Sequence, residues 1–124
     1  MWMLGGVNAS STYLNDVWSS TDGIQWLQSS IQGSFGIRDQ FGALPFNQTR
    51  NVYVFGGFDG LTTYYNDVWY TLDNCLWGEE NASPDYGGRR GFAYCDFNGS
   101  MWIIGGQNAS TYLNDVWRSN VQLA

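Results

Sequence analysis

One six-residue pattern, which occurs three times, constrains the fold of this chain more than any other feature. It reads Tyr-Leu-Asn-Asp-Val-Trp at 13–18 and 112–117, and Tyr-Tyr-Asn-Asp-Val-Trp at 64–69. Each copy follows a short apolar run that ends in a glycine pair, and the pairs recur about every 50 residues. Self-similarity at a fixed period predicts repeated structural units, each of which buries its apolar face against a neighbour.

The composition predicts a folded chain and excludes several classes of partner. Of the 124 residues, 44% are apolar and 18% aromatic, which is enough apolar surface to offset the entropy cost of ordering the chain. No apolar run approaches the ~18 residues of a membrane-spanning helix. The net charge of −6 disfavours nucleic acid and anionic membranes as partners, because binding to either needs clustered cations.

Apolar runs and turn signals predict four short strands in the middle unit, at 41–46, 52–55, 65–71 and 76–77. Equivalent runs predict the second to fourth strands of a first unit at 1–4, 13–19 and 26–27, and the first to third strands of a third unit at 92–97, 101–104 and 114–119. We expect each glycine pair to end the second strand of its unit, since glycine tolerates a positive φ and a close neighbour. Asn98-Gly99 predicts a tight hairpin turn.

The repeat resembles the kelch repeat. The resemblance rests on the apolar run that ends in Gly-Gly, the Tyr that follows, Asn-Asp-Val-Trp, and a second Trp. Arg38-x-x-Phe41 and Arg89-x-x-Phe92 are similar to the Arg-x-Gly-His that opens the innermost kelch strand, although the His is absent here. The resemblance implies an all-β fold made of kelch-type β-propeller blades of four antiparallel strands, with the repeated tryptophans packed between blades.

The predicted domain organisation is a partial blade at 1–30 (strands 2–4), a complete blade at 38–80, and a partial blade at 89–124 (strands 1–3). These blades form an incomplete ring with two open edges, whereas a closed propeller leaves none. Met1 also takes the position that Met101 has inside a later strand. We therefore expect a piece of a longer propeller; the alternative is a ring assembled from several chains.

Five Asn-x-Ser/Thr sequons predict N-glycosylation and a secretory route. They begin at Asn8, Asn47, Asn81, Asn98 and Asn108. All five fall in predicted loops or turns, where an oligosaccharide would project into solvent. The alternative explanation is that turns are rich in Asn, Gly and Ser in any compartment. The tight turn at Asn98 makes that site the weakest candidate.

Two cysteines, Cys75 and Cys95, form an even pair, and a secretory route would permit a disulfide between them. The predicted blade argues against the bond, because Cys75 begins an outermost strand and Cys95 lies in an innermost one. Three strand spacings of ~4.8 Å separate such positions, which is beyond disulfide reach. We expect two small buried thiols instead.

The sequence offers no catalytic constellation. Without His, and with only two cysteines, neither the usual zinc sites nor a Ser/His/Asp or Cys/His nucleophile can be assembled. We therefore predict no catalytic residue, no metal and no cofactor. Asp16, Asp67 and Asp115 recur once in each unit, and we expect them to accept hydrogen bonds from loop backbone.

Three arginines are candidate binding residues: Arg38, Arg89 and Arg90. They precede the predicted innermost strands, which can line the mouth of a propeller channel, and a guanidinium there can bind a carboxylate or a sugar acid. The alternative is that they pair with Asp39 or Asp85 and with loop carbonyls.

These features predict a non-enzymatic kelch-repeat scaffold of a secreted or cell-surface glycoprotein, which binds a protein or glycan or serves structural assembly. The expected partners are a protein, a glycan, further blades of the same protein or copies of the chain, but not nucleic acid. One alternative is a piece of a kelch-propeller enzyme, such as a carbohydrate oxidase or isomerase, with its active site in other blades. The other is an intracellular kelch adaptor that presents substrates to a ubiquitin ligase, against which the sequons count.

Overall fold

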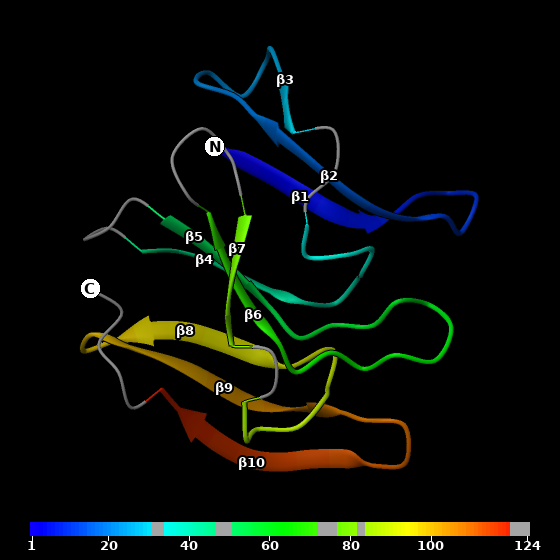
Figure 1. Ribbon diagram of the computed structural model, residues 1–124, viewed down its shortest axis with the longest axis vertical. Coiled ribbons are helices and arrows are strands. Elements are labelled where there is room, and N and C mark those ends of the chain that lie inside the picture. Colours follow the sequence, from blue (N-terminus) through cyan, green and yellow to red (C-terminus); the bar gives the residue numbers. More distant parts are fainter. Residues whose placement is uncertain (31–33, 47–50, 72–76, 82–83, 120–124) are drawn as a thin grey trace.

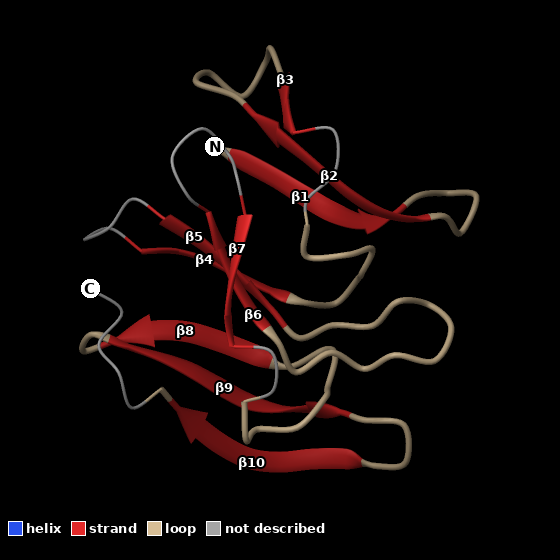
Figure 2. Ribbon diagram, in the orientation of Figure 1, coloured by secondary structure: helices blue, strands red, loops and turns tan. Residues whose placement is uncertain are grey.

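The computed structural model describes residues 1–30, 34–46, 51–71, 77–81 and 84–119, and all the regular structure in them is β-strand (Figure 2). Three antiparallel sheets follow one another along the longest axis of the molecule (Figure 1). The first sheet contains β1 (Trp2–Val7), β2 (Tyr13–Ser19) and β3 (Leu27–Ser30). The second contains β4 (Gly42–Phe46), β5 (Asn51–Phe55), β6 (Val68–Thr71) and β7 (Trp77–Asn81). The third contains β8 (Ala93–Phe97), β9 (Ser100–Gln107) and β10 (Tyr112–Arg118).

The predicted fold class is confirmed. Strands pair in chain order within each sheet, as they do in propeller blades, and no sheet closes into a ring among the described residues. The Asn98-Gly99 turn is also confirmed, since both residues have positive φ values of 51° and 76° between the paired residues Phe97 and Ser100. None of the described residues forms a helix long and apolar enough to cross a membrane.

Several strand boundaries differ from the prediction. The glycine pairs end the second strand only in the middle sheet; β1 and β9 continue through theirs, and a shift in register at this point absorbs the change in backbone direction. The fourth strands begin later and run further than predicted, so that β7 reaches Asn81, which pairs with Val68. The expectation that all five sequons lie in loops or turns is therefore wrong for Asn81.

The glycine pairs have nearly the same conformation in all three sheets. The second glycine of each pair has a φ of 97° or 98°. A Cβ atom at Gly57 would lie 2.7 Å from the Cβ of Phe41, and one at Gly106 would lie 3.0 Å from that of Phe92. The backbone therefore needs glycine here, both for the left-handed conformation and for the close approach of the innermost strand.

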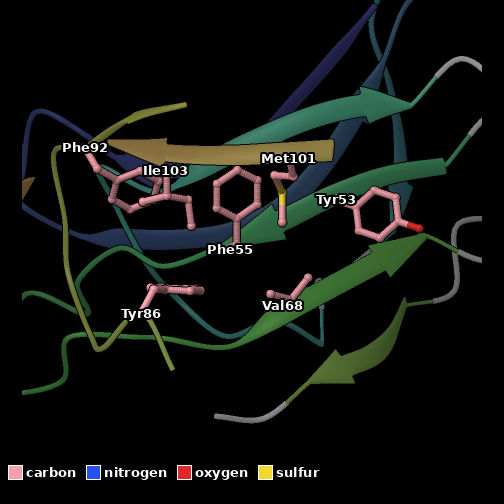
Figure 3. Packing of buried hydrophobic residues seen from close by; sticks show 7 residues of the cluster. All are labelled: Tyr53, Phe55, Val68, Tyr86, Phe92, Met101 and Ile103. Atoms are coloured by element: carbon pink, nitrogen blue, oxygen red, sulfur yellow. The ribbon is translucent and has the colours of Figure 1, made fainter. Parts of the chain in front are cut away.

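Two hydrophobic joints hold neighbouring sheets together. The first joint, between the first and second sheets, is built from Val17, Phe35, Val52, Val54 and Trp77, with Leu4, Phe41 and Trp69 packed against them. The second joint, between the second and third sheets, is built from Tyr53, Phe55, Val68, Tyr86, Phe92, Met101 and Ile103 (Figure 3). Alternate residues of β5 pack in different joints, because successive side chains of a strand point to opposite faces.

The two joints use matching positions of the repeat. Val17 and Val68 follow Asn-Asp, Phe35 and Tyr86 precede the connector arginines by three residues, and Phe41 and Phe92 follow them by three. Phe92 stacks on Phe55 with ring centroids 5.7 Å apart. The repeated sequence pattern is therefore primarily a pattern of joint residues, as predicted for packing between blades.

Candidate functional site: the arginine joints and the loop rim

Each described connector between sheets carries an arginine that bonds to both of the sheets it joins. The main chain of Arg38 lies against the first sheet, where its C=O accepts from the N–H of Gly6 at 3.1 Å and its N–H donates to Leu14 O at 3.4 Å. The Arg38 side chain, 1% exposed, belongs to the second sheet, where it donates to both carboxylate oxygens of Asp67 at 2.7 and 2.9 Å and to Gly56 O at 2.9 Å.

Arg89 repeats this arrangement between the second and third sheets. Its C=O accepts from the N–H of Gly57 at 2.8 Å, and its N–H donates to Tyr65 O at 3.1 Å. Its guanidinium donates to the Asp115 carboxylate at 2.6 and 2.9 Å and to Gly105 O at 2.9 Å. Each guanidinium also donates to the carbonyl three residues before it, so the connector itself is folded around the arginine.

The two ion pairs differ in their exposure to solvent. The side chain of Asp67 is 12% exposed, whereas that of Asp115 is 39% exposed, although both arginines are buried. Hydrogen bonds from Arg89 hold the pKa of the Asp115 carboxyl well below its ordinary value. Burial raises the pKa of the Tyr86 phenol, whose hydroxyl donates to Asp67 O, so this phenol stays a neutral donor.

The aspartates of the repeat also orient its tryptophans. The indole N–H donates to the carboxylate two residues earlier at 2.7 Å in all three units, in the pairs Asp16–Trp18, Asp67–Trp69 and Asp115–Trp117. The expectation that these aspartates bond to loop backbone is therefore wrong, because their partners are indole and guanidinium groups. The signal that could have identified the ion pairs is the matching separation of arginine and aspartate in two units.

The loops that follow the glycine pairs form a rim along one edge of the molecule (Figure 1). We call residues 8–12, 59–63 and 108–111 the loop rim. One side-chain oxygen caps each loop: Asn8 Oδ1 accepts from the N–H groups of residues 10 and 12, Asp59 Oδ1 from those of residues 61–63, and Asn108 Oδ1 from those of residues 110 and 111. These bonds measure 2.9 to 3.0 Å and fix the backbone of each loop. The prediction did not single out Asp59, although it stands in register with Asn8 and Asn108.

The comparison with known families agrees with this geometry. The sequence model of the kelch motif matches residues 88–118, a range that starts beside Arg89 and includes the whole third sheet. This is a kelch-repeat chain. The resemblance predicted from the sequence is thereby confirmed. No curated protein matches the chain. Kelch repeats generally mediate protein interactions.

The kelch arginines occupy different environments. Arg38 and Arg89 are buried and bind the chain's own carboxylates, and these carboxylates are not the Asp39 and Asp85 considered as alternatives. The Arg90 guanidinium is half-buried over the rings of Phe58 and Tyr64, with centroids 4.6 and 5.6 Å away. Binding of an external carboxylate by these arginines stays a prediction.

The sequons lie in several kinds of backbone. Asn8 and Asn98 are exposed, and Asn108 is half-buried in its rim loop. Asn81 ends β7, and Asn47 lies outside the described residues. Cys95 is a free, exposed thiol on β8, whereas two buried thiols were expected; Cys75 lies outside the described residues. The described residues include no group of three or more His, Cys, Asp or Glu side chains arranged to hold a metal ion.

Proposed function

We propose that this kelch chain is a non-enzymatic scaffold of a secreted or cell-surface glycoprotein, and that it binds a protein partner through the loop 59–63. One observation carries the proposal: the three rim loops have capped backbones but different side chains. The repeated arginines, aspartates and tryptophans bond to one another inside and beside the joints. Variation between units is therefore concentrated at the rim, where a partner can read it.

The loop 59–63 has the properties of a prepared contact surface. Asp59 fixes three successive N–H groups, so a partner that binds this loop pays little entropy to order it. Leu61, at the tip, is 81% exposed and offers an apolar side chain beside two threonines. A buried apolar anchor with polar neighbours is the usual composition of an interface centre.

The two flanking loops favour glycosylation. Asn8 and Asn108 begin sequons there, whereas the middle loop has Asp59 at the same position and cannot accept an N-linked glycan. Glycans on the flanking loops would leave the middle loop as the protein surface open to a partner. This arrangement supports an extracellular location and assigns different tasks to equivalent loops.

Expression in a secretory eukaryotic host tests the glycoprotein part of the proposal. Peptide mass spectrometry before and after enzymatic removal of N-glycans should show occupancy at Asn8 and Asn108. A Ser10→Ala variant removes the first sequon but keeps Asn8 and the backbone N–H of residue 10, so the cap survives. Secreted protein without a glycan at either asparagine would contradict this part.

A binding screen tests the scaffold part. The chain is presented to a library of purified extracellular proteins, and each hit is measured again with Leu61→Asp and Ile24→Asp. Ile24 is a matched control, because it is 83% exposed and lies in the loop at the opposite strand ends, between β2 and β3. The proposal requires a partner whose binding falls with Leu61→Asp and not with Ile24→Asp. Hits that are equally sensitive or equally insensitive to both changes would refute it.

A further inference from the structure

The third sheet has an exposed apolar face whose equivalents in the other two sheets are covered. Val17 and Val68 are 0% and 7% exposed, but the matching Val116 is 58% exposed. Phe55 is 0% exposed, whereas the matching Ile104 is 42% exposed. We call the surface made by Ile104, Gly105, Gly106, Leu113 and Val116 the open face.

The main chain at the open face has the same form as at the two joints. A Cβ atom built on Gly5 would lie 3.4 Å from Arg38 O and 3.4 Å from the ring of Phe41. On Gly56 it would lie 3.2 Å from Arg89 O and 2.6 Å from the ring of Phe92. On Gly105 the only atom within 4 Å, among the described residues, is Leu113 O at 3.1 Å. The space that an arginine connector fills at each joint is therefore open here.

The two connectors that fill this space share one sequence pattern. Residues 35–41 read Phe-Gly-Ile-Arg-Asp-Gln-Phe, and residues 86–92 read Tyr-Gly-Gly-Arg-Arg-Gly-Phe. In both, the arginine main chain bonds to the second glycine of the pair and to the carbonyl of the residue before Asn-Asp. The first aromatic residue packs in the same cluster as the valine, and the last one lies over the first glycine.

We propose that the open face binds a segment of the pattern aromatic-Gly-x-Arg-x-x-Phe, carried by a further β-unit of this kind. The segment's arginine C=O accepts from the Gly106 N–H, and its N–H donates to Leu113 O. Its phenylalanine covers Gly105, and its first aromatic ring covers Val116. A surface that is already used twice within the molecule, with the same backbone and matching side chains, thus specifies its occupant.

A second copy of the chain is the competing occupant. The first sheet exposes Met1 and Met3, at 71% and 51%, at positions that match the buried Val52 and Val54 of the first joint. That exposed surface is made by β1 and supplies no aromatic-Gly-x-Arg-x-x-Phe segment, since both described segments are already packed in joints. A copy docked through β1 would cover Val116 but leave the main-chain groups of Gly106 and Leu113 unmatched, so we favour the segment.

The test uses the whole chain, labelled with nitrogen-15, and a free nine-residue peptide that reproduces residues 34–42. This peptide contains one arginine and one aspartate, so it is not drawn to the acidic protein by net charge. The amide signals of Gly105, Gly106, Leu113 and Val116 should shift on titration. A peptide with Arg38→Pro lacks the N–H that would bond to Leu113 O and should bind about tenfold more weakly.

Protein variants complete the test. Val116→Arg should raise the dissociation constant of the peptide about tenfold or more, whereas Leu61→Arg, which changes a residue of similar high exposure on the loop rim, should leave it unchanged. Shifts confined to the other glycine pairs, or equal binding of the Arg38→Pro peptide, would overturn the proposal. Self-association that Val116→Arg abolishes and the peptide does not inhibit would assign the face to a second copy instead. The rim proposal survives any of these results, because Leu61 is not part of the open face.

Discussion

Removing the aspartate from the same position of each unit should destabilise the chain to different degrees. The substitutions are Asp67→Ala, Asp115→Ala and Asp16→Ala. All three remove a 2.7 Å bond to an indole N–H. Asp67→Ala also leaves the Arg38 guanidinium buried without its counter-charge, whereas the pair made by Asp115 is open to solvent on the carboxylate side.

The magnitudes follow from these environments. Loss of one partner from a buried ion pair costs about 3–5 kcal/mol, so Asp67→Ala should lower the free energy of unfolding by about 3 kcal/mol, because Arg38 keeps two carbonyl acceptors. Asp115→Ala should cost about 1–2 kcal/mol, since water can screen the remaining charge. Asp16→Ala loses the indole bond and should cost about 1 kcal/mol.

Urea denaturation followed by tryptophan fluorescence measures the series, with the midpoint and the slope fitted separately. For a chain of this size, about 3 kcal/mol corresponds to a fall in Tm of about 10 °C, which a thermal scan would show independently. The order of the three variants matters more than any single value. If Asp16→Ala were as destabilising as Asp67→Ala, the buried ion pair would not be what stabilises the joint.

Three further predictions concern glycines, pH and the loop caps. Gly56→Ala should cost about 2–4 kcal/mol, because its Cβ would lie 2.6 Å from a buried ring, whereas Gly87→Ala, at a similar φ with nothing within 4 Å, should cost about 1 kcal/mol; urea denaturation compares the two. The pKa of Asp115 is lowered by folding, so its contribution to stability is complete above the unfolded pKa of about 4 and is lost as the pH falls toward the folded value; Asp115→Asn should lose less stability than the parent chain between pH 4 and pH 2 in chemical denaturation. In protein made without glycans, Asn8→Ala should lower stability by about 1 kcal/mol through loss of two N–H bonds while Ser10→Ala stays within about 0.5 kcal/mol of the parent, and equal effects would contradict the role of the cap.

The internal repeat made the architecture predictable. Strand number, strand order and sheet type follow from apolar runs and turn residues that recur in register, and three copies reinforce a signal that one copy would leave ambiguous. Strand ends were predicted less well. β7 extends to Asn81 because its pairing with β6 continues past a shift in register, and no local residue signals that pairing.

The partners of the aspartates could not be read from local sequence. Asp67 and Arg38 are 29 residues apart, and Asp115 and Arg89 are 26 apart. Aspartate near a loop ordinarily bonds to nearby backbone, so the local rule favoured that outcome. A buried guanidinium overrides the local rule, because it needs a counter-charge wherever the fold can supply one.

The division of each connector arginine between two sheets has a consequence for how such chains can grow by duplication. The ion pair lies inside one unit, while the main-chain bonds of the same residue cross to the unit before it. A duplicated stretch that runs from one arginine to the residue before the next would carry its own aspartate and a fresh glycine pair for its successor. Such an insertion creates no orphaned charge at either boundary. The chemistry of the joint therefore makes the unit interchangeable in number, while the rim loops remain free to diverge in sequence.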